Sequence, residues 1–127
     1  MGPRALTDWF ADHLDGAVLS EPTRAYVVSV MAGMNPDAVF GPGESVVLAY
    51  AEARAAHDFV RFQRIGDWVL WVEVWAPAYV ARDQRVVESI GRLSYATCHR
   101  ILRGTWPIYE ELADQLPDIV AELRAIR

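Results

Sequence analysis

The chain has 127 residues, of which 53% are hydrophobic and 23% are charged, and its formal net charge is −5. This length is typical of one domain, so we expect a single helical domain over residues 1–127. A chain of this size buries enough surface to fold without disulfides or a structural metal. Its single cysteine, Cys98, excludes an internal disulfide framework and a zinc site made of several thiolates.

The sequence contains no segment that resembles a signal peptide or a membrane span. Its longest uncharged apolar stretch, residues 74–81, is far shorter than the roughly 20 residues needed to cross a bilayer. We therefore expect a cytoplasmic protein that has no membrane partner.

The charges are unevenly distributed along the chain. Residues 1–53 have a net charge of −5, residues 54–103 of +3 and residues 104–127 of −3. Either the basic middle packs beside the acidic ends, or it forms a basic patch for a partner such as nucleic acid. The acidic total argues against nonspecific phosphate binding, so we favour internal compensation and expect no nucleic acid partner.

The first half of the chain predicts three helices. In residues 5–19, apolar side chains recur at steps of three and four, which is typical of an amphipathic helix. Pro22 favours the first turn of a second helix, which we expect to run to about Gly33. Turn residues follow, and residues 44–62 then predict one long alanine-rich helix.

Residues 64–77 are compatible with either a helix or a strand. Their valines and tryptophans favour a strand, but helical spacing places four side chains on one face: Trp68, Trp71, Val72 and Trp75. A lone strand would leave its backbone donors unpaired. We therefore predict a helix that Asp67 caps and Pro77 ends, with a short strand at about 68–75 as the alternative.

Residues 85–103 predict another amphipathic helix. Its expected apolar stripe consists of Val86, Ile90, Leu93, Thr97 and Ile101. Gly91 lies in the middle of this helix, where glycine is unfavourable. Together with Ser94 it indicates that another helix approaches closely there.

The last segment predicts a pair of helices after a break at residues 104–107, with Pro117 opening the second helix. The carboxylates of Glu110 and Glu111 are expected in a solvated first turn. The whole chain thus predicts an all-α fold, a compact bundle of six or seven helices. The alternative is an α+β fold with the short strand described above.

Several segments together resemble a family of uncharacterised bacterial proteins. The resemblance is carried by residues 21–32, 65–71 and 108–113, by Pro77 and by residues 91–95. Family members tend to have glycine and two aromatic residues before the proline, whereas this chain has Val74, Trp75 and Ala76. The resemblance implies an all-helical fold and implies no activity.

No pattern in the sequence indicates catalysis, so we predict no catalytic, cofactor-binding or metal-ligating residue. The chain lacks Glu-x-x-His repeats, a phosphate-binding loop and a nucleophile elbow. Cys98 and His99 are neighbours that diverge on a helix, and Cys98 is expected in the core. A metal site assembled from His13, His57 and His99 is a less favoured alternative.

The densest mixture of charged and aromatic residues gives a candidate interaction or pocket surface. It consists of Arg61, Arg64, Asp67, Trp68, Trp71, Trp75, Arg92 and Tyr95. One interpretation is a packed tryptophan core with an internal Arg–Asp pair. The other is a contact surface, since tryptophan, tyrosine and arginine dominate interface energetics.

Two functions fit these features. The favoured hypothesis is a non-enzymatic helical interaction or assembly module that self-associates or docks on a larger protein complex, either as a cellular adaptor or as a phage or particle component. The alternative is a regulatory protein that binds a small-molecule ligand in a pocket lined by Trp68, Trp71, Trp75 and Tyr95. A metal-dependent enzyme ranks third.

Overall fold

The computed structural model describes residues 19–126, which contain helices and no strand. The α-helices are α2 (Glu21–Gly33), α3 (Val46–Ala56), α4 (Phe59–Trp75), α5 (Pro77–Val80), α6 (Gln84–Ile101) and α7 (Pro107–Ile126). Two 3-10 turns, η1 (Pro36–Ala38) and η2 (Ala81–Asp83), connect them. The predicted all-α class is confirmed and the strand alternative at 68–75 is wrong.

The number of helices differs slightly from the predicted six or seven. Within residues 19–126 there are five helices of eleven residues or more, and α5 is a single turn. The helix predicted over residues 5–19 lies outside the described residues except for Leu19, which precedes α2. None of the described helices is both long and apolar enough to span a membrane.

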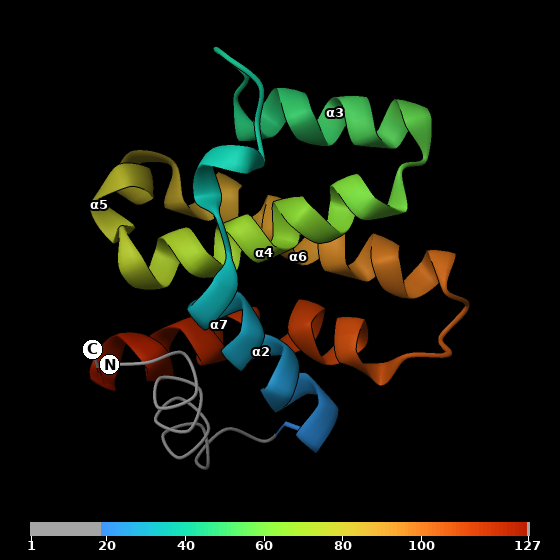
Figure 1. Ribbon diagram of the computed structural model, residues 1–127, viewed down its shortest axis with the longest axis vertical. Helices are drawn as coiled ribbons and strands as arrows, with labels where there is room; N and C mark the ends of the chain where they lie inside the picture. Colours follow the sequence, from blue (N-terminus) through green and yellow to red (C-terminus); the bar gives the residue numbers. More distant parts are fainter. Residues whose placement is uncertain (1–18, 127) are drawn as a thin grey trace.

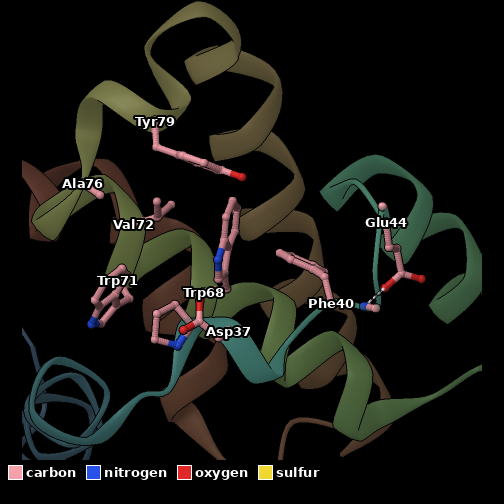
Figure 2. A pocket seen from close by; sticks show the side chains of 11 residues that line it. Asp37, Phe40, Glu44, Trp68, Trp71, Val72, Ala76 and Tyr79 are labelled. Atoms are coloured by element: carbon pink, nitrogen blue, oxygen red, sulfur yellow. Dashed lines mark hydrogen bonds between the residues drawn. The ribbon is translucent and has the colours of Figure 1, made fainter.

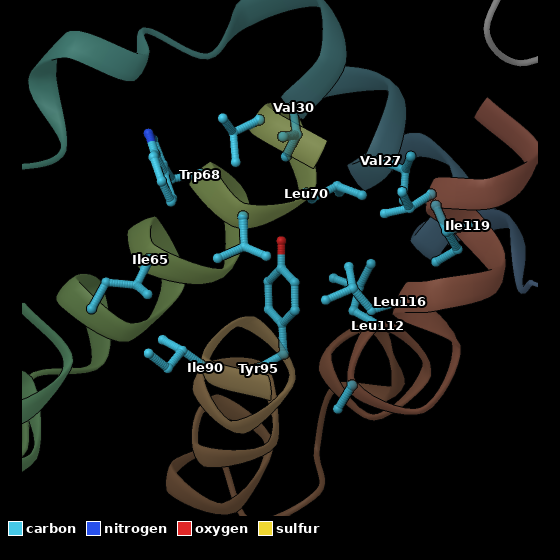
Figure 3. Close-up of a cluster of buried hydrophobic side chains, with 14 of the residues drawn as sticks. Val27, Val30, Ile65, Trp68, Leu70, Ile90, Tyr95, Leu112, Leu116 and Ile119 are labelled. Carbon is cyan, nitrogen blue, oxygen red and sulfur yellow. The ribbon is translucent and has the colours of Figure 1, made fainter. Parts of the chain in front are cut away.

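The helices form one layered bundle (Figure 1). Helix α4 packs along α6, α6 packs along α7, and α3 lies over α4 on the side away from α7. Helix α2 crosses α7, so the first and last described helices are neighbours. The core between them is apolar and is drawn in Figure 3, where Tyr95 projects from α6 into the middle of the cluster.

Two glycines allow α4 and α6 to approach closely. A Cβ atom added at Gly91 would lie 2.6 Å from Cγ1 of Val69, and one added at Gly66 would lie 2.7 Å from Cε1 of Tyr95. Ser94, which is also fully buried, lies one turn beyond Gly91 on α6. The predicted close approach of another helix at Gly91 and Ser94 is therefore confirmed, and that helix is α4.

The prediction that the apolar stripe of α6 faces the core is mostly wrong. Only Ile90 of its five residues is buried, and Leu93 is 48% exposed. The inward face consists of Val87, Ile90, Gly91, Ser94, Tyr95 and Cys98. Because Gly91, Ser94 and Cys98 occupy part of the buried face, a search for large aliphatic residues selects the neighbouring, solvent-facing stripe instead.

The single helix predicted over residues 44–62 is divided in two. His57 adopts a left-handed backbone conformation with φ of 51°, which ends α3. The side chain of Asp58 then accepts a hydrogen bond from the backbone N–H of Arg61 and begins α4. Helix α4 therefore starts earlier than predicted, and Asp67 lies inside the helix instead of capping it.

The predicted helix start at Pro117 is wrong, because α7 is continuous through this proline. Proline has no backbone N–H, so the carbonyl of Ala113 loses its helical donor. The Nε–H of Arg92 on α6 donates to that carbonyl at 2.8 Å. A side chain from the neighbouring helix thus supplies the hydrogen bond that Pro117 removes.

The same compensation occurs at the end of α4. Pro77 cannot donate to the carbonyl of Glu73, four residues earlier. The Nε–H of Arg124 on α7 donates to this carbonyl at 2.6 Å. The two arginine bonds therefore connect α6 to α7 and α7 to α4.

The prediction that Glu111 lies in a solvated turn is wrong, because its side chain hydrogen-bonds to the start of α2. Its carboxylate accepts the backbone N–H of Ser20 at 2.7 Å, the Ser20 hydroxyl at 2.5 Å and the Thr23 hydroxyl. Burial alone would raise the pKa of Glu111, but these hydrogen bonds keep it below its ordinary value. Glu110 is exposed, as predicted.

Candidate functional site

A hollow lies over α4, where η1, the following loop and α5 fold back on it (Figure 2). Its volume is about 530 Å³, which falls within the range of roughly 300–1,000 Å³ found for ligand sites. We call it the Trp68 pocket. Its lining consists of Pro36, Asp37, Phe40, Gly41, Gly43, Glu44, Trp68, Trp71, Val72, Ala76 and Tyr79.

Local sequence features explain how this pocket forms. Trp68, Trp71 and Val72 have the spacing of neighbours on one helical face, so α4 presents them together. The side chain of Asn35 accepts the N–H of Asp37 and begins η1. The N–H of Gly41 donates to Glu44 Oε1 at 3.1 Å, which closes the loop that carries Phe40, Gly41, Gly43 and Glu44.

Aromatic rings from three parts of the chain surround Trp68, which is itself almost fully buried. The ring of Phe40 lies 4.8 Å from that of Trp68 at an interplanar angle of 75°. The ring of Tyr79 lies 6.3 Å away at 79°. Figure 2 shows Tyr79 and Phe40 on different sides of Trp68, and Trp71 on the side of Trp68 away from Phe40. The walls of the pocket are therefore aromatic on several sides.

The charged groups of the lining are both acidic. Asp37 is exposed, and its carboxylate has no hydrogen-bond or ion-pair partner among residues 19–126. Glu44 accepts the Gly41 amide and pairs with Arg61. The Gly41 amide, the Glu52 side chain and the Arg61 guanidinium together lower the pKa of Glu44. No basic side chain lines the pocket.

The structure brings only part of the predicted surface together. Trp68 and Trp71 line the pocket, and Arg61 contacts it indirectly through Glu44. Trp75, which is 36% exposed, is not part of the lining. Arg64 is exposed elsewhere on α4.

The other predicted site residues contact the rest of the protein and do not line the Trp68 pocket. Tyr95 lies entirely in the core, and Arg92 is engaged with the carbonyl of Ala113. Asp67 accepts hydrogen bonds from the hydroxyls of Tyr26 at 2.7 Å and Tyr95 at 2.8 Å. Its partners are thus two tyrosines, and the expected internal Arg–Asp pair is wrong. A pocket lined jointly by Trp75 and Tyr95 does not form in the described part of the chain.

Asp67 and Glu73 are two carboxylates that α4 places inside the protein. Burial raises the pKa of Asp67 to about 6, although its tyrosine hydrogen bonds oppose the shift. Glu73 is fully buried, and neither of its carboxylate oxygens has a hydrogen-bond partner in residues 19–126. Burial, followed by the nearby charge of Glu88, raises the pKa of Glu73 to about 7, against the effect of Arg124. Neither carboxylate lines the Trp68 pocket.

Cys98 is buried and unpaired, which confirms the predicted core position. Burial raises the pKa of its thiol to about 12, so the thiol stays protonated at neutral pH. No set of three histidine, cysteine or acidic side chains in the described range is placed to hold a metal ion. His13, from the alternative metal site, lies outside that range.

A second hollow of about 460 Å³ lies between α3 and α6, and its charged lining residues are basic. It contains Arg54, His57 and Arg100 beside the exposed apolar side chains of Leu93 and Ile101. Tyr50, Phe62 and Thr97 complete its lining. We call it the α3–α6 groove.

Sequence reasoning missed most of the Trp68 pocket lining, including its acidic residues Asp37 and Glu44 and its aromatic residues Phe40 and Tyr79. Asp37 lies in η1, Phe40 and Glu44 in the loop that follows, and Tyr79 in the single-turn helix α5, and none of these segments has a periodic pattern. The available signal was the position of Phe40 directly before Gly41-Pro42-Gly43, since a tight turn can fold an aromatic side chain back onto a helix.

Comparisons of the chain with protein-family models, with curated proteins and with solved structures find no match. The resemblance to a bacterial family thus stays a prediction, and the function has to be inferred from the Trp68 pocket and the rest of the described surface.

Proposed function

We propose that this protein is a non-enzymatic binding module and that the Trp68 pocket is its recognition site. The observation that carries the proposal is an aromatic cavity of ligand size that remains open although the adjoining core is well filled. Tyr79 is 79% exposed while its ring contacts Trp68. Exposed aromatic side chains around a cavity are typical of binding sites.

The chemistry of the lining supports binding over catalysis. The pocket contains no histidine, cysteine, serine or threonine. Its two carboxylates are Asp37, which is exposed, and Glu44, which Arg61 and Gly41 already engage. Such a site lacks the nucleophile and adjacent base that covalent catalysis requires.

The α3–α6 groove favours a second candidate function, docking of a protein partner. Leu93 and Ile101 expose apolar surface there beside Arg54 and Arg100, which suits a partner with apolar and acidic side chains. Light scattering of the wild type and of a Leu93→Asp variant tests whether that partner is a second copy. We expect a wild-type dimer that the substitution dissociates, and a monomeric wild type would reject self-association.

The proposed recognition site can be tested by NMR with a library of neutral, cationic and anionic aromatic fragments. We expect at least one fragment to shift the backbone amide signals of residues 37–44 and 68–79. Trp71→Ala should weaken the best fragment at least tenfold, a loss of about 1.4 kcal/mol or more in binding free energy.

Trp75→Ala is the matched control for this experiment, because Trp75 is on the same helix but outside the pocket lining. It should leave fragment affinity unchanged. If no fragment shifts the pocket signals, or if both tryptophan variants weaken binding equally, the Trp68 pocket is not the recognition site.

A further inference from the structure

The lining of the Trp68 pocket combines aromatic walls with negative charge. Four aromatic side chains come from three elements: Phe40 from the loop after η1, Trp68 and Trp71 from α4, and Tyr79 from α5. A cation over an aromatic face is attracted by the ring quadrupole, most strongly for tryptophan. The pocket therefore offers several surfaces of the kind that attract positive charge.

The rings of Phe40 and Tyr79 pack edge to face against Trp68, with centroid distances of 4.8 Å and 6.3 Å. Phe40 and Tyr79 are inclined by 75° and 79° to the ring of Trp68, so their faces point in different directions. Figure 2 shows Tyr79 and Phe40 on separate sides of Trp68. A group held in the pocket would therefore lie against aromatic side chains that differ in orientation.

The charge of the site is complementary to a cation. Asp37 and Glu44 are in the lining and no arginine or histidine is. Arg61 compensates Glu44 from outside, which leaves the negative charge of Asp37 without a partner among the described residues. An anionic ligand would be repelled, and a neutral ligand would lack the Coulomb attraction that a cation gains from this carboxylate.

We propose that the Trp68 pocket binds a methylated ammonium group, of the kind found in quaternary ammonium metabolites and in trimethyllysine. This inference rests on the proposed function and names the ligand class for the same site. The aromatic walls supply no strong hydrogen-bond acceptor, and of the two carboxylates in the lining Glu44 is already engaged by Gly41 and Arg61. A primary ammonium carries three donors that would lose their water partners there, whereas a trimethylammonium group carries none.

The volume agrees with such a ligand. A space of about 530 Å³ is larger than one trimethylammonium group and leaves room for the carbon chain that carries it. A free metabolite and a methylated lysine side chain present the same group, so both are compatible with the walls. The experiment has to separate these two sources.

The test is a titration followed by pocket amide signals and tryptophan fluorescence. The probes are choline, its neutral carbon isostere 3,3-dimethylbutan-1-ol, and short peptides that contain trimethyllysine or unmodified lysine. We expect the better of the two methylated probes to bind at least tenfold more tightly than the neutral isostere. Tighter binding of choline would indicate a metabolite, and tighter binding of the trimethyllysine peptide would indicate a protein partner.

Matched variants test the named residues. Asp37→Asn should weaken the methylated cation threefold to tenfold and leave the neutral isostere unaffected, while Asp118→Asn on the exposed face of α7 should change neither. Trp71→Ala should abolish cation binding, and Trp71→Phe should restore part of it. Circular dichroism of each variant verifies that the helices are intact.

Two results would overturn the inference in distinguishable ways. Equal affinity for choline and its neutral isostere, with a trimethyllysine peptide no tighter, would leave an apolar binding pocket and reject the cation. Failure of these probes and of every fragment to shift pocket signals would reject the proposed function as well.

Discussion

One face of α4 packs closely against α6, and the opposite face borders an open cavity. The face toward α6 carries Gly66 and Val69 and buries Glu73, and its small side chains bring the two backbones close together. The opposite face carries Trp68 and Trp71, which leave an open cavity beneath η1 and α5. One face gains stability from close contact, whereas the other retains a space that another molecule can fill.

This difference leads to a general expectation for substitutions in and around α4. Changes at the face toward α6 should alter the free energy of unfolding. Changes at the pocket face should alter ligand affinity and have smaller effects on unfolding. Three substitutions test this separation, and they are ordered by decreasing effect on stability.

Replacing Glu73 by glutamine should remove a pH-dependent destabilisation. The pKa of Glu73 is about 7 in the folded protein and ordinarily 4.5, so its stabilising contribution is greatest below about pH 4.5 and is lost as the pH rises through about 7. Glutamine cannot ionise. The Glu73→Gln variant should therefore be more stable than wild type by up to about 3 kcal/mol at about pH 8, and nearly equal to it at about pH 4.

Urea unfolding at these two pH values measures the effect of Glu73→Gln. The variant should keep a smaller decrease in stability with rising pH, because Asp67, whose pKa is about 6, still ionises. An equal stability change at both pH values would show that Glu73 contributes through packing and not through ionisation.

Gly91→Ala should destabilise the protein by about 1 to 2 kcal/mol. The added Cβ would lie 2.6 Å from Cγ1 and 2.8 Å from Cβ of Val69, and a side chain branched at Cβ cannot rotate away from such a contact. The cost of separating α4 and α6 should exceed the gain of about 1 kcal/mol in helix propensity. Thermal unfolding of the variant gives the net effect.

Gly33→Ala is the control for this substitution. Gly33 is also helical, and a Cβ there would meet nothing within 4 Å. It should be neutral or slightly stabilising. A stabilising effect of Gly91→Ala would contradict the view that small side chains are required on this face.

Trp71→Ala should have the smallest effect on stability, below about 1 kcal/mol, although it changes side-chain volume more than Glu73→Gln or Gly91→Ala does. Trp71 is only partly buried, and it borders a space that is already open. Chemical unfolding measures this value beside the fragment titration. A loss of several kcal/mol would show that Trp71 belongs to the core and that the two faces are not separable.

The sequence was sufficient to predict the parts of the fold that depend on periodicity. Helical spacing correctly placed Trp68 and Trp71 on one face, and the unfavourable glycine at position 91 correctly indicated a close helix contact. The large aliphatic residues of α6 were misleading, because its buried face includes Gly91, Ser94 and Cys98, which an aliphatic pattern does not reveal. The break at His57 was missed because a left-handed histidine gives no signal as clear as glycine or proline.

The helical residues of the candidate site could be predicted from the sequence, but its loop residues could not. Trp68 and Trp71 are on a helix, so their relative positions follow from the sequence. Asp37, Phe40 and Tyr79 reach them through loop and turn conformations that depend on tertiary packing. Similarly, Arg92 was predicted as a surface contact because nothing local indicates that Pro117 leaves a carbonyl for it to bind.

The bond between Arg92 and the carbonyl of Ala113 constrains the order in which this sequence can change. If Arg92 is lost while Pro117 is present, the carbonyl keeps neither a helical donor nor a side-chain donor. If Pro117 first becomes alanine, the helix supplies its own N–H and the arginine becomes dispensable. Arg124, Glu73 and Pro77 are related in the same way. In each case the route that removes the proline first avoids the less stable intermediate.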